Sequence, residues 1–385
     1  MTGYPFESDK FSEDGIKLVR GMNVKRGYLD FSEDICVKWN SCVGLENYLL
    51  KDGDILIQMD GALIGKSYAK IKKNQLPALL VQRVTRARTN NKLASQDFMY
   101  QTIQRDFLRY IGMNKTETAV PHLSLNDIRN FEIMVPGLAE QNKIGTYFSN
   151  LDRLITLHQR KCDEIKSLKK YMLQKMFPQN EQKVPEIRFE GFTEAWEQRK
   201  LSDIYDSIGN AFVGTATPYY AEQGHFYLES NNVKDGQINH NSEIFINDEF
   251  YEKQKDKWLH TGDMVMVQSG HVGHAAVIPE ELDNTAAHAL IMFRNPKEEI
   301  EPYFLNYEYQ TDKAKKKIEN ITTGNTIKHI LASDMQEFVV DVPNYEEQKV
   351  IASYFRNIDH LITLHQQKCE ELKKIKKFML QKMFV

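Results

Sequence analysis

The residues best suited to chemistry in this sequence form a basic run between positions 66 and 92, where no Asp or Glu occurs. Clustered ammonium and guanidinium groups attract phosphate, and binding to a phosphate backbone releases its condensed counterions. The alternative is a solvated surface, because many charge runs are only hydrated faces. We expect a phosphate-binding surface in the first half of the chain. Its predicted members are Arg20, Asn23, Lys25, Arg26, Lys66, Lys70, Lys72, Lys73, Arg83, Arg86, Arg88 and Lys92.

The second half of the chain carries polar loops in place of a continuous basic run. Asn, Gln and Ser are residue types that form hydrogen bonds with base edges. We therefore expect these loops to contact a nucleic acid through side-chain amides and hydroxyls. The predicted contacts are Ser230, Asn231, Asn232, Lys234, Gln268, Ser269, His271 and Asn325.

A glycine-rich stretch, residues 61–67 (GALIGKS), resembles a phosphate-binding loop. A nucleotide-binding loop of this kind has four residues between its glycines, and this stretch has three. The equivalent stretch in the second half, residues 269–274, lacks the Lys-Ser pair. The preferred interpretation is a glycine turn that follows a strand and faces the ligand of the domain.

Histidines occur in two further groups that could bind a metal. His158 and Cys162 lie four residues apart, as do His365 and Cys369, so each pair shares one helical face and could contribute to a zinc site. A polar registry element within a helix seam is the alternative. Loop positions at a ligand-binding surface are the preferred interpretation of the second group, which comprises His271, His274 and His288. No credible catalytic centre is apparent.

Composition narrows the class of protein. The chain has 385 residues and a formal net charge of −3, so any nucleic-acid binding must come from local patches. No apolar run approaches 18 residues, which predicts no membrane span. The N-terminus is polar and unlike a signal peptide. The four cysteines contain no CxxC pair, which indicates a reduced, cytoplasmic protein.

The element that must position all these residues is a helix present twice. Residues 151–177 and 358–384 are identical at 19 of 27 aligned positions, at a constant shift of 207. Apolar and neutral residues recur at alternating steps of three and four, which predicts long helices over about 140–177 and 347–384 that pair antiparallel. The predicted pairing residues are Leu151, Ile155, His158, Cys162, Ile165 and Met172 with Ile358, Ile362, His365, Cys369, Leu372 and Met379. In the first helix, Lys169 is the one break in this pattern.

The segments before the two helices also repeat each other, more loosely. Residues 15–24 align with 224–233, and residues 131–136, a predicted strand followed by proline, align with 338–343. The predicted strands agree, whereas the loops differ, as expected of one scaffold with two binding surfaces. Residues 185–209 have no counterpart in the first half, so the first domain is expected to lack an opening segment.

Two variable α/β halves, each closed by a hydrophobic–proline step, a Glu-Gln pair and a long helix ending LQKMF, resemble the DNA-specificity (S) subunit of type I restriction–modification enzymes. The resemblance covers nearly the whole chain. It implies an α/β fold with two target-recognition domains, joined by two long antiparallel coiled-coil helices and pseudo-two-fold symmetric. We expect target-recognition domain 1 at 1–139, a central spacer helix at 140–178, target-recognition domain 2 at 179–342 and a C-terminal spacer helix at 343–385.

The resemblance also implies a non-catalytic subunit that reads a bipartite site in double-stranded DNA and recruits two methyltransferase (M) subunits and restriction (R) subunits. No cofactor is expected in this chain. S-adenosylmethionine belongs to the partner methyltransferase, and ATP and Mg²⁺ belong to the partner restriction subunit. The alternatives are a stand-alone metal-dependent DNA nuclease, which would be active with Mg²⁺ alone, and a coiled-coil adaptor without DNA contact, which would give no sequence preference.

Overall fold

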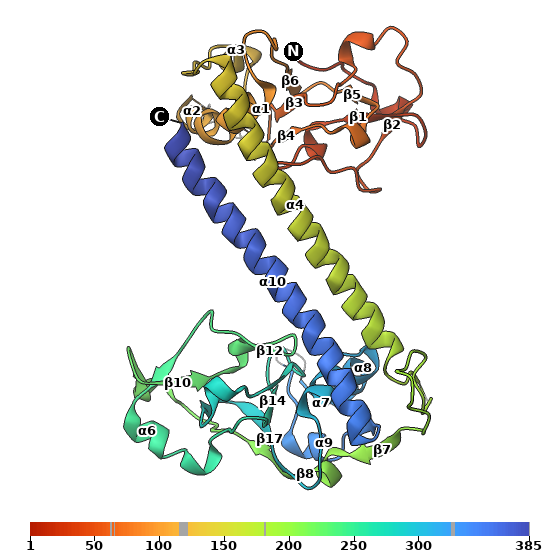
Figure 1. Cartoon of the computed structure of the whole chain (residues 1–385), viewed down its shortest axis with the longest axis vertical. Helices are drawn as coiled ribbons and strands as arrows, with labels where there is room; N and C mark the ends of the chain where they lie inside the picture. Colours follow the sequence, from red (N-terminus) through yellow and green to blue (C-terminus); the bar gives the residue numbers. More distant parts are fainter. Residues whose placement is uncertain (62–63, 65, 115–121, 181, 325–327, 385) are drawn as a thin grey trace. The chain divides into compact units, whose positions relative to one another are not determined.

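The structure is a computed structural model that describes residues 1–61, 64, 66–114, 122–180, 182–324 and 328–384. It divides into two compact units, one formed by residues 1–159 with 367–385 and the other by residues 160–366. Each unit contains one sheet-based domain and about half of each long helix (Figure 1). The units are called unit 1 and unit 2 below.

Unit 1 has two three-stranded sheets. One has the order β2 (Lys38–Trp39), β1 (Ile16–Val19) and β5 (Ala78–Leu80), and the other β4 (Tyr68–Lys70), β3 (Ile55–Gln58) and β6 (Val84–Ala87). Helices α1 (Gln96–Thr102), α2 (Leu108–Asn114) and α3 (Leu125–Arg129) follow the strands.

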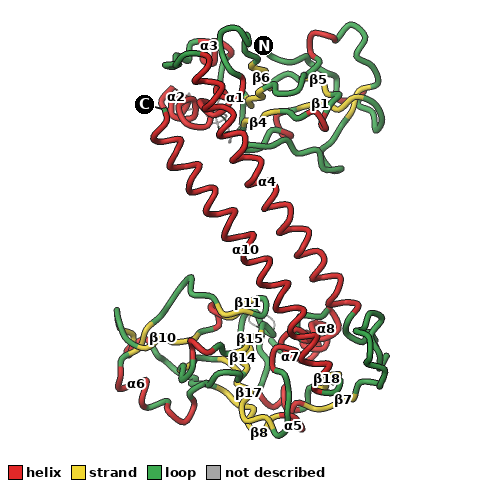
Figure 2. Tube along the Cα trace, in the orientation of Figure 1, coloured by secondary structure: helices red, strands yellow, loops and turns green. Residues whose placement is uncertain are grey.

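Unit 2 is richer in strands, which Figure 2 shows in yellow. Its two largest sheets have four strands each. One has the order β15 (Ala275–Val277), β14 (Met264–Val267), β17 (Leu290–Pro296) and β8 (Tyr205–Asn210). The other has the order β16 (Ala286–Ala287), β10 (His225–Leu228), β13 (Phe245–Ile246) and β9 (Tyr220–Ala221). Two pairs complete it, β18 (Val339–Val342) with β7 (Glu197–Lys200) and β11 (Val233–Lys234) with β12 (Gln237–Ile238). Its short helices are α5 (Leu201–Ile204), α6 (Asp248–Glu252), α7 (Pro302–Glu308), α8 (Asp312–Ile321) and α9 (Ala332–Gln336).

The same turn follows β1 in unit 1 and β10 in unit 2. The Asn23 side chain accepts a hydrogen bond from the backbone N–H of Arg20 and donates to the carbonyl of Asp30. Asn232 accepts from the N–H of Glu229 and donates to the carbonyl of Asn239. Both asparagines are buried, so each satisfies main-chain groups that would otherwise lose water without compensation.

The two long helices are α4 (Leu138–Lys175) and α10 (Tyr345–Met383), close to the predicted bounds (Figure 1). In unit 1, Ile144, Phe148 and Leu151 of α4 pack with Leu372 of α10. In unit 2, the later part of α4 packs with the earlier part of α10, which confirms the antiparallel pairing. Seven predicted pairing residues are buried: Leu151, Cys162, Ile165, Ile358, Ile362, Cys369 and Leu372. Five are half-buried: Ile155, His158, Met172, His365 and Met379.

The break in the apolar pattern has a structural explanation. In unit 2, Lys169 of α4 forms an ion pair of 2.7 Å with Asp359 of α10 and donates to the side chain of Gln310 at 3.0 Å. In unit 1, the repeat-equivalent Lys376 pairs with Asp152 at 2.6 Å and donates to Gln104 at 2.7 Å. Each unit therefore fixes the register of its two helices, and their place on the domain, with one equivalent polar cluster.

One strand expected in unit 1 is absent. Residues 131–135 were predicted as a strand, but they have no regular secondary structure. Their equivalent in unit 2, β18, pairs antiparallel with β7. The described part of unit 1 supplies no such partner strand, and an extended segment without a partner leaves its backbone hydrogen bonds unmade.

Candidate nucleic-acid interface

Unit 1 contains a groove of about 950 Å³ where its domain meets α4 and α10, called groove 1 here. Its lining combines domain residues with side chains from both long helices. Eight of its residues are Lys or Arg, and Asp152, already paired with Lys376, is its single acid. The basic residues are Arg26, Lys70, Lys72, Arg105, Arg153, Lys373, Lys376 and Lys377. Lys70, Arg105, Lys373 and Lys376 form ion pairs with Asp97, Asp106, Glu370 and Asp152. The other four basic residues form no ion pair with any described residue, and this excess of positive charge favours a polyanionic ligand.

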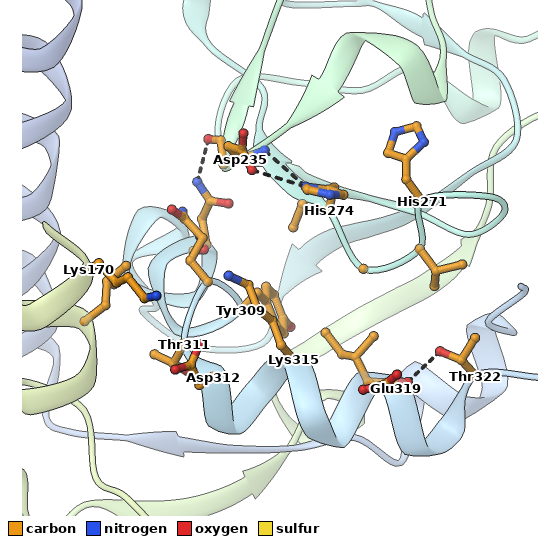
Figure 3. Close-up of a pocket in the computed structure, with 18 of the residues that line it drawn as sticks. Lys170, Asp235, His271, His274, Tyr309, Thr311, Asp312, Lys315, Glu319 and Thr322 are labelled. Carbon is orange, nitrogen blue, oxygen red and sulfur yellow. Dashed lines mark hydrogen bonds and ion pairs between the residues drawn. The ribbon is translucent and has the colours of Figure 1, made fainter. Parts of the chain in front are cut away.

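Unit 2 has an equivalent groove of about 530 Å³, called groove 2 and drawn in Figure 3. Lys166, Lys169 and Lys170 of α4 line it, and these are the repeat equivalents of Lys373, Lys376 and Lys377. The other wall comes from the β11–β12 turn, the loop at residues 270–274 and α8. Its lining also includes three acids, Asp235, Asp312 and Glu319, so groove 2 is mixed in charge where groove 1 is basic.

Two histidines hold the loop that faces groove 2 (Figure 3). The His274 ring accepts a hydrogen bond from the backbone N–H of Asp235 at 3.1 Å, and the His271 ring lies 2.9 Å from the carbonyl of Ser230. Burial lowers the pKa of His274, although the nearby Asp235 carboxylate opposes this shift. A neutral ring at His274 accepts the Asp235 bond, and His271 stays exposed beside the groove.

Some of the basic residues predicted to bind phosphate in unit 1 line groove 1, and others do not. Arg26, Lys70 and Lys72 line groove 1. Lys66 and Lys73 are exposed but do not line it, and Lys25 is half-buried. Arg83 is exposed, adopts a positive φ of 73° and lies 3.6 Å from Asp60.

Four residues predicted to contact DNA from unit 1 instead hold its fold. Asn23 is buried in the turn described above. An Arg20 nitrogen donates to the carbonyl of Ile35 at 2.7 Å, and Arg86 donates to the carbonyls of Asn47 and Leu49. Arg88 makes a bidentate pair of 2.6 Å bonds with Asp54, which is 1% exposed. Arginine forks that already bind protein oxygens are not free for phosphate, which corrects the expectation for these side chains.

In unit 2 the predicted contacts divide in a similar way. Asn231 and Lys234 are exposed, and Ser230, Gln268 and Ser269 are half-buried beside the same loops. Asn232 is buried and bonded to the main chain, so the expectation of a base contact from this side chain is corrected. The remaining predicted contact, Asn325, lies outside the described residues.

The sequence interpretation missed the cations that the long helices contribute. Lys373 and Lys377 of α10, Arg153 of α4 and Arg105 all line groove 1, and Lys170 of α4 lines groove 2. A signal was present, because the double lysine at 169–170 recurs at 376–377 within the repeated helix. One lysine of each doublet forms the interhelix ion pair, and the other lines the groove.

Membrane-spanning helices and metal-ligand clusters are both absent from the residues that the structure describes. No helix among them is long and apolar enough to cross a membrane. No group of three or more His, Cys, Asp or Glu within the described ranges is placed to hold a metal ion.

Two units that share a fold and equivalent helix lysines, but differ in their loops, define a duplicated recognition scaffold. The family model described as "Type I restriction modification DNA specificity domain" matches the chain over residues 6–167 and again over residues 193–374. The chain therefore belongs to the family of type I restriction–modification specificity subunits, and the resemblance seen in the repeated helices is confirmed.

Curated relatives agree with this membership. The chain is 22% identical over 387 residues to the type I restriction enzyme MjaVIII specificity subunit of Methanocaldococcus jannaschii, covering 97% of this chain and 83% of that protein. It is 21% identical over 368 residues to the type I restriction enzyme EcoBI specificity subunit of Escherichia coli, covering 91% of this chain and 74% of that protein. These relatives give no support to the nuclease or adaptor alternatives.

Solved structures share the fold. The S subunit of a type I restriction–modification system from M. genitalium superposes with a TM-score of 0.66 at 13% identity, covering 100% of this chain and 93% of that chain. A chain from a study of complex assembly and conformational transition in a type I restriction–modification system superposes with a TM-score of 0.51 at 17% identity, covering 96% and 91%.

Proposed function

We propose that each unit binds one part of a split DNA site, with its groove against the phosphate backbone and its differing loops against base edges. One observation carries this proposal. Equivalent lysines of α4 and α10 line a groove beside each domain, while the loops that share those grooves differ between the units. Phosphate contacts position a protein on DNA, whereas contacts to base edges give sequence preference.

The different charges of the two grooves assign them different shares of the binding energy. Groove 1 has eight basic residues and one acid, so it supplies more of the salt-dependent affinity. In groove 2, Asp235, Asp312 and Glu319 weaken a purely electrostatic attraction. Carboxylates can instead accept hydrogen bonds from cytosine amino groups and reject other bases, so unit 2 depends more on direct readout.

The outer faces of the long helices support the recruitment of two methyltransferase subunits. Exposed apolar residues occur at repeat-equivalent positions, Leu154 with Leu361 and Leu157, which also lines groove 1, with Leu364. Tyr171 and Phe378 form a third exposed equivalent pair. Large apolar side chains at matching places on an otherwise charged helix indicate protein contacts, and a duplicated stripe offers two equivalent docking sites.

The proposed role leaves the chemistry to the partners. This chain would be non-catalytic and would bind no cofactor itself. S-adenosylmethionine would act in the methyltransferase subunits, and ATP with Mg²⁺ in the restriction subunits. The four cysteines are free, which supports our placing the complex in the reducing cytoplasm.

The experiment that tests this proposal is a map of methylated adenines across the host genome. With this gene present, we expect methylation at a single bipartite motif, and deletion of the gene should abolish it. Complementation with the double variant Leu154→Glu, Leu361→Glu, at two exposed positions that line neither groove, should fail to restore methylation, while the purified variant should still bind DNA. A methylation pattern that is unchanged without the gene would refute the proposed function.

A further inference from the structure

In unit 2, residues 187–200, which precede β8, connect the domain to α10 through three kinds of contact. Arg188 makes two bonds of 2.7 Å to Glu347, whose side chain is fully buried. Trp196, 2% exposed, packs edge-on against the rings of both Phe177 and Phe304, at 5.8 and 5.5 Å. Strand β7 then pairs with β18 along four residues. The segment thus contributes an arginine fork, an indole and a strand.

Unit 1 presents the acceptor for each of these three groups. The β18 equivalent, residues 132–135, is unpaired, and Met134 is 90% exposed. Glu140, the equivalent of Glu347, is exposed, and none of the described residues forms an ion pair with it. The Glu140 carboxylate and the backbone of residues 132–135, which makes no hydrogen bond to any other described residue, are complementary to an arginine and an extended strand.

The acceptor for the indole is a cleft of about 480 Å³ beside the exposed segment. Phe98 and Phe384 line it, and these rings stack on each other at 5.1 Å. Their equivalents in unit 2 are the Phe304 and Phe177 rings that hold Trp196, which stack at 5.4 Å. Met134, Val135 and Glu140 line the same cleft, so the three acceptors form one continuous site.

A fourth position extends the site along α4. In unit 2, the ring of Phe189 packs against Tyr354 at 5.8 Å. The equivalent of Tyr354 in unit 1 is Tyr147, which is 39% exposed. Single exposed apolar residues are common, but Tyr147, Val135 and Met134 match covered positions of a duplicated scaffold, which indicates a surface adapted to a cover.

From these observations we propose that unit 1 carries a docking site, formed by residues 131–140, Phe98, Tyr147 and Phe384, for an extended polypeptide segment. The segment has the chemistry of residues 187–200 of this chain: an arginine that forks onto Glu140, a tryptophan that enters the cleft and a strand that pairs with residues 132–135. Binding adds a strand to an open edge, as in peptide recognition by β-augmentation. Its cleft shares only Arg105 with the described lining of groove 1, and the site does not depend on DNA binding.

The test uses the full-length chain and a fluorescent synthetic peptide of residues 185–204. We expect saturable binding by anisotropy, together with slower hydrogen exchange of the backbone amides at 132–135. The variant Glu140→Gln should weaken binding at least tenfold, and a peptide with Trp196→Ala should bind at least tenfold more weakly. The control Glu371→Gln, an exposed residue of α10 in the same unit with the same change of charge, should leave the affinity unchanged.

Three results would overturn the proposal: absence of saturable binding, equal affinity for Glu140→Gln and the parent chain, or binding that leaves exchange at 132–135 unchanged. Exchange of the peptide with the covalent segment of unit 2 would instead speed hydrogen exchange at 197–200, which now pair with 339–342, and it also counts against the proposal. Because Glu140 is exposed, its substitution by Gln is not expected to affect folding, and a thermal melt of the variant checks this.

Discussion

The interpretation of groove 1 makes a quantitative prediction about salt. Lys72, Arg153 and Lys377 line the groove, are exposed and form no ion pair with any described residue. If each neutralises one phosphate, replacing all three by Gln reduces the slope of log affinity against log salt by about 2.7, at roughly 0.9 per contact. At about 0.1 M salt, the same relation predicts an affinity about 500-fold weaker.

The assay is a salt titration of binding to a random duplex, because the backbone contribution does not require the target sequence. The matched control replaces Lys10, Lys51 and Lys143, three exposed lysines of unit 1 outside the groove, by Gln. The control should change the slope by less than about 1. If the groove variant keeps the parental slope, or if both triple variants change it equally, the assignment of groove 1 to the phosphate backbone is wrong.

Two further predictions concern stability. Arg88→Ala should destabilise unit 1 by about 1–3 kcal/mol in chemical denaturation, because it leaves the buried Asp54 carboxylate without its ion-pair partner. The partial exposure of Arg88 moderates this loss. Unchanged stability would show that the ion pair is dispensable. Glu308 is fully buried, and burial raises its pKa to about 8 from the ordinary 4.5 despite nearby Lys313 and a bond from the N–H of Asp341. Because the folded pKa lies above the unfolded one, its contribution to stability is complete below about pH 4.5 and is lost as the pH rises through about 8. Glu308→Gln should therefore raise the melting temperature at about pH 8.5 more than at about pH 5, and an equal effect at both pH values would contradict the raised pKa.

The corrected residues show where interpretation of a basic run is ambiguous. Arg86 and Arg88 are as basic as Arg26 and lie in the same acid-free run, yet their guanidinium groups bind Leu49 and Asp54. Alternation along β6 could have warned of inward-facing side chains, but the acid that pairs with Arg88 lies 34 residues away in sequence. A charge-reversal of this cluster would therefore test folding before it tested DNA binding.

Asn23 and Asn232 illustrate a second ambiguity. An asparagine in a polar loop can read an adenine edge or satisfy a turn, and sequence alone does not separate the two roles. The repeat favours the structural role, because the two asparagines occupy equivalent positions and make the same turn hydrogen bonds in both units. Residues shared by two domains that read different DNA are expected to be structural, and residues that differ are better candidates for recognition.

What the sequence by itself determined is the duplicated framework. A near-identical helix at a shift of 207 residues, with an apolar seam and no Gly or Pro between residues 151 and 177, specifies two long helices and their equivalence. This information is local and periodic, so it survives without knowledge of any distant contact. Family membership followed from the same repeat.

Tertiary structure decided which polar residues remain available for a ligand. In the sequence, Lys169 interrupts the apolar pattern of α4, and only the structure shows its ion pair with Asp359. Lys377 has the pattern of a solvent-facing lysine, and only the structure shows that it lines groove 1. Residues 132–135 have a strand-like pattern, but a strand exists only where another chain segment completes its hydrogen bonds. Burial, ion pairing and strand pairing depend on partners remote in sequence, and therefore only the folded chain reveals them.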